Sequence, residues 1–132
     1  RTRLACLPMD DVQENAAMVN AIQRRSDVVV QKSLAEGFGL TVAEAMWKSR
    51  PVIASGRGGI QDQIIDGETG VLLADPEDLE AYGEALRALV GDAGLRERLG
   101  VTARERVEGE FLGTRHLLQY LELLTGLLEA RA

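Results

Sequence analysis

The 132-residue sequence has few of the residues that support disulfide or metal chemistry. Cys6 is the only cysteine and His116 the only histidine. An intramolecular disulfide is therefore excluded, and a thiolate zinc cluster is out of reach. No apolar run approaches the roughly 18–20 residues that span a bilayer, and residues 1–8 lack the long apolar segment of an export signal. We therefore expect a cytoplasmic protein without a membrane span. The use of a metal stays open, although no Asp-x-Asp pair marks a site.

Basic residues are outnumbered, with 15 Lys and Arg against 21 Asp and Glu, which gives a net charge of -6. This balance argues against nucleic-acid binding, because phosphate chains need a clustered basic surface. Aromatic residues make up only 4% of the chain, but the hydrophobic fraction of 45% is ordinary for a globular protein. The length suits a single domain. A small anionic ligand remains possible, since backbone amides and a few basic side chains can hold a diphosphate.

Apolar runs and helical repeats alternate along the chain. Strands are expected at residues 4–7, 28–30, 51–54 and 71–73, and helices at residues 11–25, 41–48, 60–65, 75–90, 93–109 and 113–130. Asp11 with Glu14 forms a capping-box pattern for the first helix, and Asp75 is expected to cap the fourth. The uniformly β-branched run 28–30 is typical of a central strand that is buried on both faces. The alternation predicts an α/β fold with a parallel sheet and flanking helices, and ligands in such sheets bind at the carboxyl ends of strands.

The segment EGFGLTVAE carries two glutamates around a glycine-rich turn. Glu36 lies in the expected strand-to-helix loop, and Glu44 lies one turn inside the helix that follows. Gly37 and Gly39 allow close approach of the backbone to a ligand. The amides from Gly39 to Thr41 would point out of a helix N-terminus, where a phosphate is favoured. A carboxylate such as Glu44 can accept hydrogen bonds from two vicinal sugar hydroxyls.

Simpler explanations of the same residues are open. The spacing of Thr41 and Glu44 is also that of an ordinary capping box, and Glu36 alone could be a solvated loop carboxylate. The glycine loops match neither a dinucleotide fingerprint, since Val42 and Gln61 stand where it needs a third small residue, nor a P-loop, since neither ends in Gly-Lys-Ser/Thr. A dehydrogenase and a phosphate-hydrolysing motor are therefore disfavoured.

The whole run QKSLAEGFGLTVAEAMWKSRPVIASGRGGIQDQIIDGETGVLL resembles the core of family 4 retaining glycosyltransferases. Together with CLPMDDVQENAAMVNAIQ upstream, it is most similar to the members that synthesise trehalose from a nucleotide-diphosphate glucose and glucose. The resemblance covers about residues 4–125. It implies a partial Rossmann-like fold, the C-terminal, nucleotide-sugar-binding domain of a GT-B enzyme. It also implies that Glu36 contacts and orients the donor sugar, and that Phe38 and Gly39 offer amides to it.

By the same resemblance, Leu40 and Thr41 would present amides to the diphosphate and Glu44 would bind the ribose. The leaving diphosphate itself would assist the incoming hydroxyl, so that no protein nucleophile is needed. The basic clamp of the family lies upstream of the first residue of this chain. Arg57, and less so Lys32, are the basic residues expected nearest the diphosphate, with solvated side chains as the alternative for both.

The resemblance further implies that an N-terminal domain and the first two strands are missing. A six-stranded order 3-2-1-4-5-6 that starts at its third strand would leave residues 28–30 as an exposed apolar edge, so we expect self-association. A non-catalytic α/β binding or interaction module remains the alternative function. We expect a surface or packing role for His116 and core packing for Trp47. Leu117, Leu121, Leu124 and Leu128 form a core-type stripe on the last helix. In the family a late helix crosses to the other domain, so the resemblance implies that part of this stripe is bare here.

Overall fold

The computed structural model describes residues 2–130, and within this range three strands alternate with four helices and are followed by two further helices. The strands are β1 (Val29–Gln31), β2 (Val52–Ser55) and β3 (Val71–Leu73). The helices are α1 (Val12–Arg25), α2 (Leu40–Trp47), α3 (Ile60–Gln63), α4 (Leu79–Gly91), α5 (Ala93–Glu110) and α6 (Gly113–Glu129). All three strands run parallel in the order β1-β2-β3. The predicted α/β class with flanking helices is confirmed.

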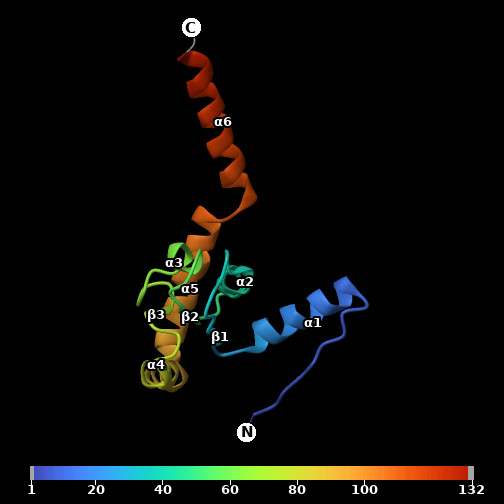
Figure 1. Cartoon of the computed structure of the whole chain (residues 1–132), viewed down its shortest axis with the longest axis vertical. Coiled ribbons are helices and arrows are strands. Elements are labelled where there is room, and N and C mark those ends of the chain that lie inside the picture. Colours follow the sequence, from blue (N-terminus) through green and yellow to red (C-terminus); the bar gives the residue numbers. More distant parts are fainter. Residues whose placement is uncertain (1, 131–132) are drawn as a thin grey trace.

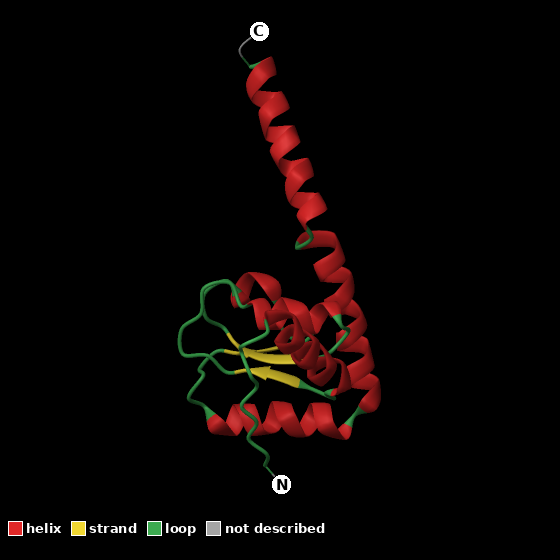
Figure 2. Cartoon of the chain, turned by 90° about the vertical axis from the view of Figure 1, so that its right-hand side faces the viewer, coloured by secondary structure: helices red, strands yellow, loops and turns green. Residues whose placement is uncertain are grey.

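Strand β2 is the centre of the described sheet, and its residues are buried on both faces. Val52 and Ala54 enter an apolar cluster with α2 and α5, in which Met46 is fully buried. Ile53, which points to the opposite face, packs with Leu89 of α4. This alternation follows from the two-residue period of a strand. Figure 2 shows helices on either side of the sheet, which explains why a run such as VIAS carries no polar face.

Two expectations about strands are wrong. Residues 4–7 form no strand, and Leu4 is fully exposed, because no segment between residues 2 and 130 pairs with them. The run at 28–30, shifted by one residue into β1, is an edge of the sheet rather than its centre, and Val30 is 37% exposed. A β-branched run indicates a strand, but it does not show how many neighbours the strand has or how deeply it is buried. The edge position agrees with what the family resemblance implies.

The cap of α1 is confirmed, whereas that of α4 is not. The carboxylate of Asp11 accepts hydrogen bonds from the amides of Gln13 and Glu14, at 2.8 and 3.0 Å. Asp75 instead accepts from the amide of Glu77 at 2.9 Å and forms a turn. Asp78 caps α4, three residues later than expected. Both aspartates have the local chemistry of a cap, so the sequence alone does not distinguish them.

Helix α6 extends away from the rest of the molecule, as Figure 1 shows. None of its described residues is buried. The expected core stripe is exposed, from 52% at Leu121 to 71% at Leu128, so a core role for these leucines is wrong for the described residues. His116 lies on the same helix, with its ring edge-on to Tyr120 at 4.8 Å, in keeping with a surface role.

The indole of Trp47 is not part of the core. Trp47 is 37% exposed, and the guanidinium of Arg104 lies over its ring at 4.7 Å from the centroid. Core packing was therefore the wrong expectation. The helical period gave the correct face for Val42 and Met46, which are fully buried, but Trp47 falls at the margin of that face.

Candidate functional site

The two glycine-rich loops follow neighbouring parallel strands and lie against each other. One loop runs from β1 to α2 and the other from β2 to α3. The amide of Gly59 donates a hydrogen bond to the carbonyl of Gly37 at 2.6 Å. Gly58 has a φ of 55°, and a Cβ at this position would lie 1.7 Å from the carbonyl oxygen of Glu36. Glycine at 58 is therefore required both by the backbone conformation and by the space between the loops.

Helix α2 begins without a side-chain cap. Its N-cap is Gly39, with a φ of 86° in the left-handed region. The capping-box explanation of Thr41 and Glu44 is therefore wrong, because neither side chain bonds the first turn of the helix. Among residues 2–130, the amides of Leu40 and Thr41 have no hydrogen-bond acceptor. Free amides at a helix N-terminus carry the positive end of the helix dipole, which favours an anion.

Glu36 is half-buried and tied to its own loop. Its Oε2 accepts hydrogen bonds from Nε2 of Gln31 at 3.2 Å and from the hydroxyl of Ser33 at 3.4 Å. Its Oε1 accepts from the amide of Gly37 at 3.1 Å. A freely solvated loop carboxylate would have none of these partners. The bonds fix the orientation of a group that can still accept hydrogen bonds from a ligand.

Glu44 is exposed beside a cavity of about 390 Å³. Its Oε2 accepts a hydrogen bond from Nε2 of Gln23 at 3.1 Å. The cavity is lined by residues of α1 and α2, namely Val12, Asn15, Ala16, Val19, Asn20, Glu44 and Lys48. Glu44 therefore lines this cavity and has one hydrogen bond to α1.

The two basic residues expected near the diphosphate, Arg57 and Lys32, make few contacts with other described residues. Nη1 of Arg57 donates to the neighbouring carbonyl of Gly56 at 3.4 Å, and its side chain is half-buried. Lys32 is half-buried and forms no ion pair with any described residue. A phosphate contact for either residue stays a prediction.

Phe38 is held by residues that sequence reasoning missed. Nε2 of the buried Gln63 donates to its carbonyl oxygen. Its ring meets Phe111 edge-on, with the centroids 6.3 Å apart. The guanidinium of Arg106, 5.6 Å from the Phe111 ring, donates to the carbonyls of Gln63 and Asp62, both at 2.7 Å. No local pattern could have found these partners, since Arg106 lies 43 residues from Gln63.

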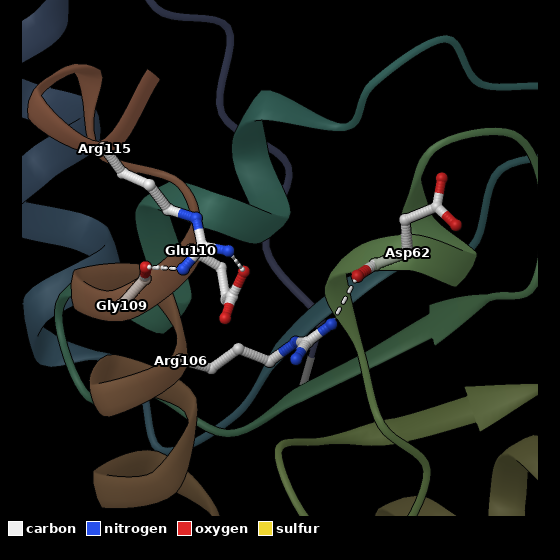
Figure 3. Close-up of polar contacts among 5 residues, drawn as sticks. All are labelled: Asp62, Arg106, Gly109, Glu110 and Arg115. Carbon is white, nitrogen blue, oxygen red and sulfur yellow. Dashed lines mark hydrogen bonds and ion pairs between the residues drawn. The ribbon is translucent and has the colours of Figure 1, made fainter. Parts of the chain in front are cut away.

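Figure 3 shows the contact of Arg106 with Asp62 and the contacts of Arg115 at the start of α6. Arg106 extends from α5 to the carbonyl end of α3, where a cation complements the helix dipole. Arg115 of α6 bonds back to α5, with Nη1 on the carbonyl of Gly109 at 2.8 Å and Nη2 on the Glu110 carboxylate at 2.9 Å. The loop that carries Phe38 is thus connected through Phe111 to the base of α6.

No three His, Cys, Asp or Glu side chains between residues 2 and 130 are grouped as metal ligands. Over the same residues, no helix has both the length and the apolar character needed to cross a lipid bilayer.

A parallel sheet with two loops in contact at its carboxyl edge, beside a helix N-terminus with free amides, is an arrangement in which α/β domains bind anionic ligands. The sequence profile described as Glycosyl transferases group 1 matches residues 12–106, and the chain belongs to this family. Its expected membership of the GT-B glycosyltransferases is confirmed.

Relatives and solved structures agree with this assignment. The chain is 46% identical over 113 residues to a trehalose synthase of Pyrococcus horikoshii, covering 86% of this chain and 26% of that protein. Sucrose-phosphate synthase from Thermosynechococcus elongatus superposes with a TM-score of 0.74 at 35% identity, covering 94% of this chain and 30% of that one. A mutant of TarM from S. aureus, in complex with UDP and sugar ligands, gives 0.73 at 28% identity, covering 80% and 22%. The chain thus spans about a quarter of the length of the curated relatives it matches.

Proposed function

We propose that this chain is the donor-binding domain of a retaining glycosyltransferase that binds a nucleotide-diphosphate glucose. The observation that carries the proposal is the contact between the two glycine loops beside the free amides of Leu40 and Thr41. This contact supports a single site with a carboxylate on either side, Glu36 before the helix N-terminus and Glu44 inside it. The complex of TarM with UDP, at 28% identity, adds support.

In the proposed complex each group has one task. The amides of Leu40 and Thr41 bind the diphosphate, with Arg57 as an additional cation. The amides of Phe38 and Gly39 bind the donor sugar, and Glu36 accepts hydrogen bonds from its hydroxyls. A role for these amides is supported by the left-handed Gly39, which turns the chain into α2.

Glu44 is proposed to accept hydrogen bonds from the ribose hydroxyls. The unbonded Oε1 and the adjoining cavity of about 390 Å³ support this role. A vicinal diol needs two acceptor positions, which one carboxylate can supply.

The proposed chemistry needs no protein nucleophile. The bond between the anomeric carbon and the diphosphate oxygen breaks, and the diphosphate leaves with the electron pair. The acceptor hydroxyl attacks from the same face and passes its proton to the leaving group. Amides at the start of α2 stabilise the negative charge that develops there, because they are oriented before the reaction begins. The contribution of the protein is thus positioning and charge stabilisation.

We propose a sugar acceptor, and glucose in particular, with trehalose as the product. The 46% identity to a trehalose synthase supports this specificity. The acceptor site and the basic clamp for the diphosphate would come from a preceding N-terminal domain of the same enzyme. We also propose a cytoplasmic setting, and self-association of the isolated chain through the edge of β1.

The binding test is calorimetric titration of UDP-glucose and ADP-glucose into this chain, with circular dichroism to confirm folding. We expect binding of at least one donor, and about tenfold weaker binding after Glu44→Ala, because hydrogen bonds to a charged group are lost. Glu84→Ala, an exposed glutamate on α4, is the matched control and should bind as the wild type does. A folded wild type that binds neither donor, or an equal affinity for Glu44→Ala, contradicts the proposal.

A second test distinguishes an enzyme from the alternative, a non-catalytic binding module. This chain is joined to the N-terminal part of the trehalose synthase of Pyrococcus horikoshii, replacing the matching quarter, and formation of trehalose from UDP-glucose or ADP-glucose and glucose is measured. We expect turnover that falls at least about 100-fold for Glu36→Gln, with donor binding retained. A folded chimaera that binds donor but transfers no sugar favours the binding module.

A further inference from the structure

Helix α1 has a polar residue, Gln23, where it is buried against the rest of the molecule. Its only buried residue is Gln23, at 5% exposure. By contrast, its apolar residues Val12 and Ile22 are 75% and 52% exposed. A buried amide needs hydrogen-bond partners, because losing water without replacement is costly. The partners of Gln23 therefore indicate why a polar residue is buried here.

Both ends of the Gln23 amide are bonded to charged groups of α2. Nε2 donates to Oε2 of Glu44 at 3.1 Å, and Oε1 accepts from Nζ of Lys48. The amide has one orientation only, since reversing it would set oxygen against the carboxylate and NH₂ against the ammonium. Glu44 and Lys48 are four residues apart on one face of α2.

Gln23 lies between two groups that would otherwise attract each other. A glutamate and a lysine at this spacing commonly form a direct ion pair. Within residues 2–130, no such pair joins Glu44 and Lys48 within 4.0 Å. The amide oxygen accepts one hydrogen bond from the ammonium, and the amide nitrogen takes one of about four acceptor positions on the carboxylate. Oε1 of Glu44 receives no hydrogen bond from a described residue, and Glu44 is one of the residues that line the cavity.

We infer that Gln23 is a positioning residue for ribose recognition, holding the carboxylate of Glu44 in the orientation that accepts the two ribose hydroxyls and keeping it from pairing with Lys48. This inference rests on the proposed role of Glu44. Gln23 itself does not touch the nucleotide. We therefore expect its effect to be confined to the ribose hydroxyls that Glu44 binds in the proposed complex.

The test compares UDP with 2′-deoxy-UDP, each titrated calorimetrically into this chain. We expect the wild type to bind UDP at least about tenfold more tightly, because the deoxy nucleotide leaves an acceptor of Glu44 unpaired. Glu44→Ala should reduce the affinity ratio to about one. Gln23→Met, which keeps the volume but removes the amide, should reduce the ratio to about threefold. Gln13→Met, an exposed glutamine on the same helix, should leave it unchanged.

The affinity ratio separates positioning from mere support of the fold. A Gln23→Met chain that binds both nucleotides more weakly by the same factor, with the ratio unchanged, overturns the inference. A wild type that does not distinguish the nucleotides overturns the ribose role of Glu44, and the inference with it. A ratio that collapses in Glu44→Ala but survives in Gln23→Met overturns the inference alone.

Gln23→Glu provides a second measurement that does not depend on the tolerance of this site for methionine. The side chain keeps its shape, but a carboxylate replaces the donor that faces Glu44 and attracts Lys48 more strongly. We expect a lower ratio than for Gln23→Met, with circular dichroism unchanged. A ratio equal to that of the wild type in a folded Gln23→Glu chain counts against positioning by the amide.

Discussion

The loop edge of the sheet and the two terminal helices of this chain contrast sharply. At the loop edge, between β1 and α3, backbone groups bond across loops and glycines fit where no side chain could. In α6 none of the described residues is buried, and in α1 only Gln23 is buried. The conformation of the loop edge is therefore determined by contacts within the chain itself. We therefore expect the exposed apolar side chains of α6 to contribute little to the stability of this chain, whereas close contacts at the loop edge and in the core contribute much.

The largest effect is expected at Gly58. Gly58→Ala places a Cβ against the Glu36 carbonyl in a left-handed conformation, and we expect a loss of about 4 kcal/mol in the free energy of unfolding. Gly67 is the matched control, with a φ of 74° but nothing within 4 Å of its Cβ. Gly67→Ala should cost only about 1 kcal/mol, the conformational penalty alone. If urea unfolding gives the same loss of unfolding free energy for Gly58→Ala and Gly67→Ala, the two glycine loops can move apart at little cost.

A smaller difference is expected between apolar residues of the two regions. Met46 is fully buried in α2, whereas Leu124 of α6 is 54% exposed. Met46→Ala should lower the free energy of unfolding by about 3 kcal/mol through lost burial and a cavity. Leu124→Ala should change it by less than about 0.5 kcal/mol. A large effect at Leu124, measured by thermal unfolding at low concentration, would mean that α6 packs on the chain in solution.

The smallest change in stability is expected at the exposed edge of β1, where Val30→Lys should cost under about 0.5 kcal/mol. Its effect on assembly should be larger. We expect the wild type to sediment above the monomer mass of 14.3 kDa, and Val30→Lys to approach it, because a charge on an edge strand opposes pairing. A monodisperse wild-type monomer contradicts self-association. If Leu124→Lys alone gives a monomer, the contact lies on α6 rather than β1.

The sequence predicts the described strands well where apolar runs are bounded by turn residues. Pro51 before β2 and the Asp66–Gly70 turn before β3 mark their strands to within one residue. The two glycine loops could likewise be assigned to one edge, because parallel strands place their carboxyl ends together. Local chemistry was sufficient in each case.

What the sequence could not supply are contacts between distant residues and the choice among equivalent local patterns. The bonds of Glu44 to Gln23 and of Arg106 to Gln63 join residues 21 and 43 positions apart. The apparent capping box at Thr41 failed because α2 begins one residue earlier, after a left-handed glycine. Residues 4–7 have the composition of a strand, but no described segment pairs with them. Strand pairing depends on distant residues, so local composition does not predict it.

The bend at Phe111 gives α6 the geometry of a lever. The helix has 17 residues, and hence a length of about 25 Å. A rotation of about 10° at its base would carry its far end through about 4 Å, while the ring of Phe111, close to the pivot, would barely move against Phe38. A small change of angle at the base of α6 would therefore move its far end by several ångströms and leave the contact of Phe111 with Phe38 almost unchanged.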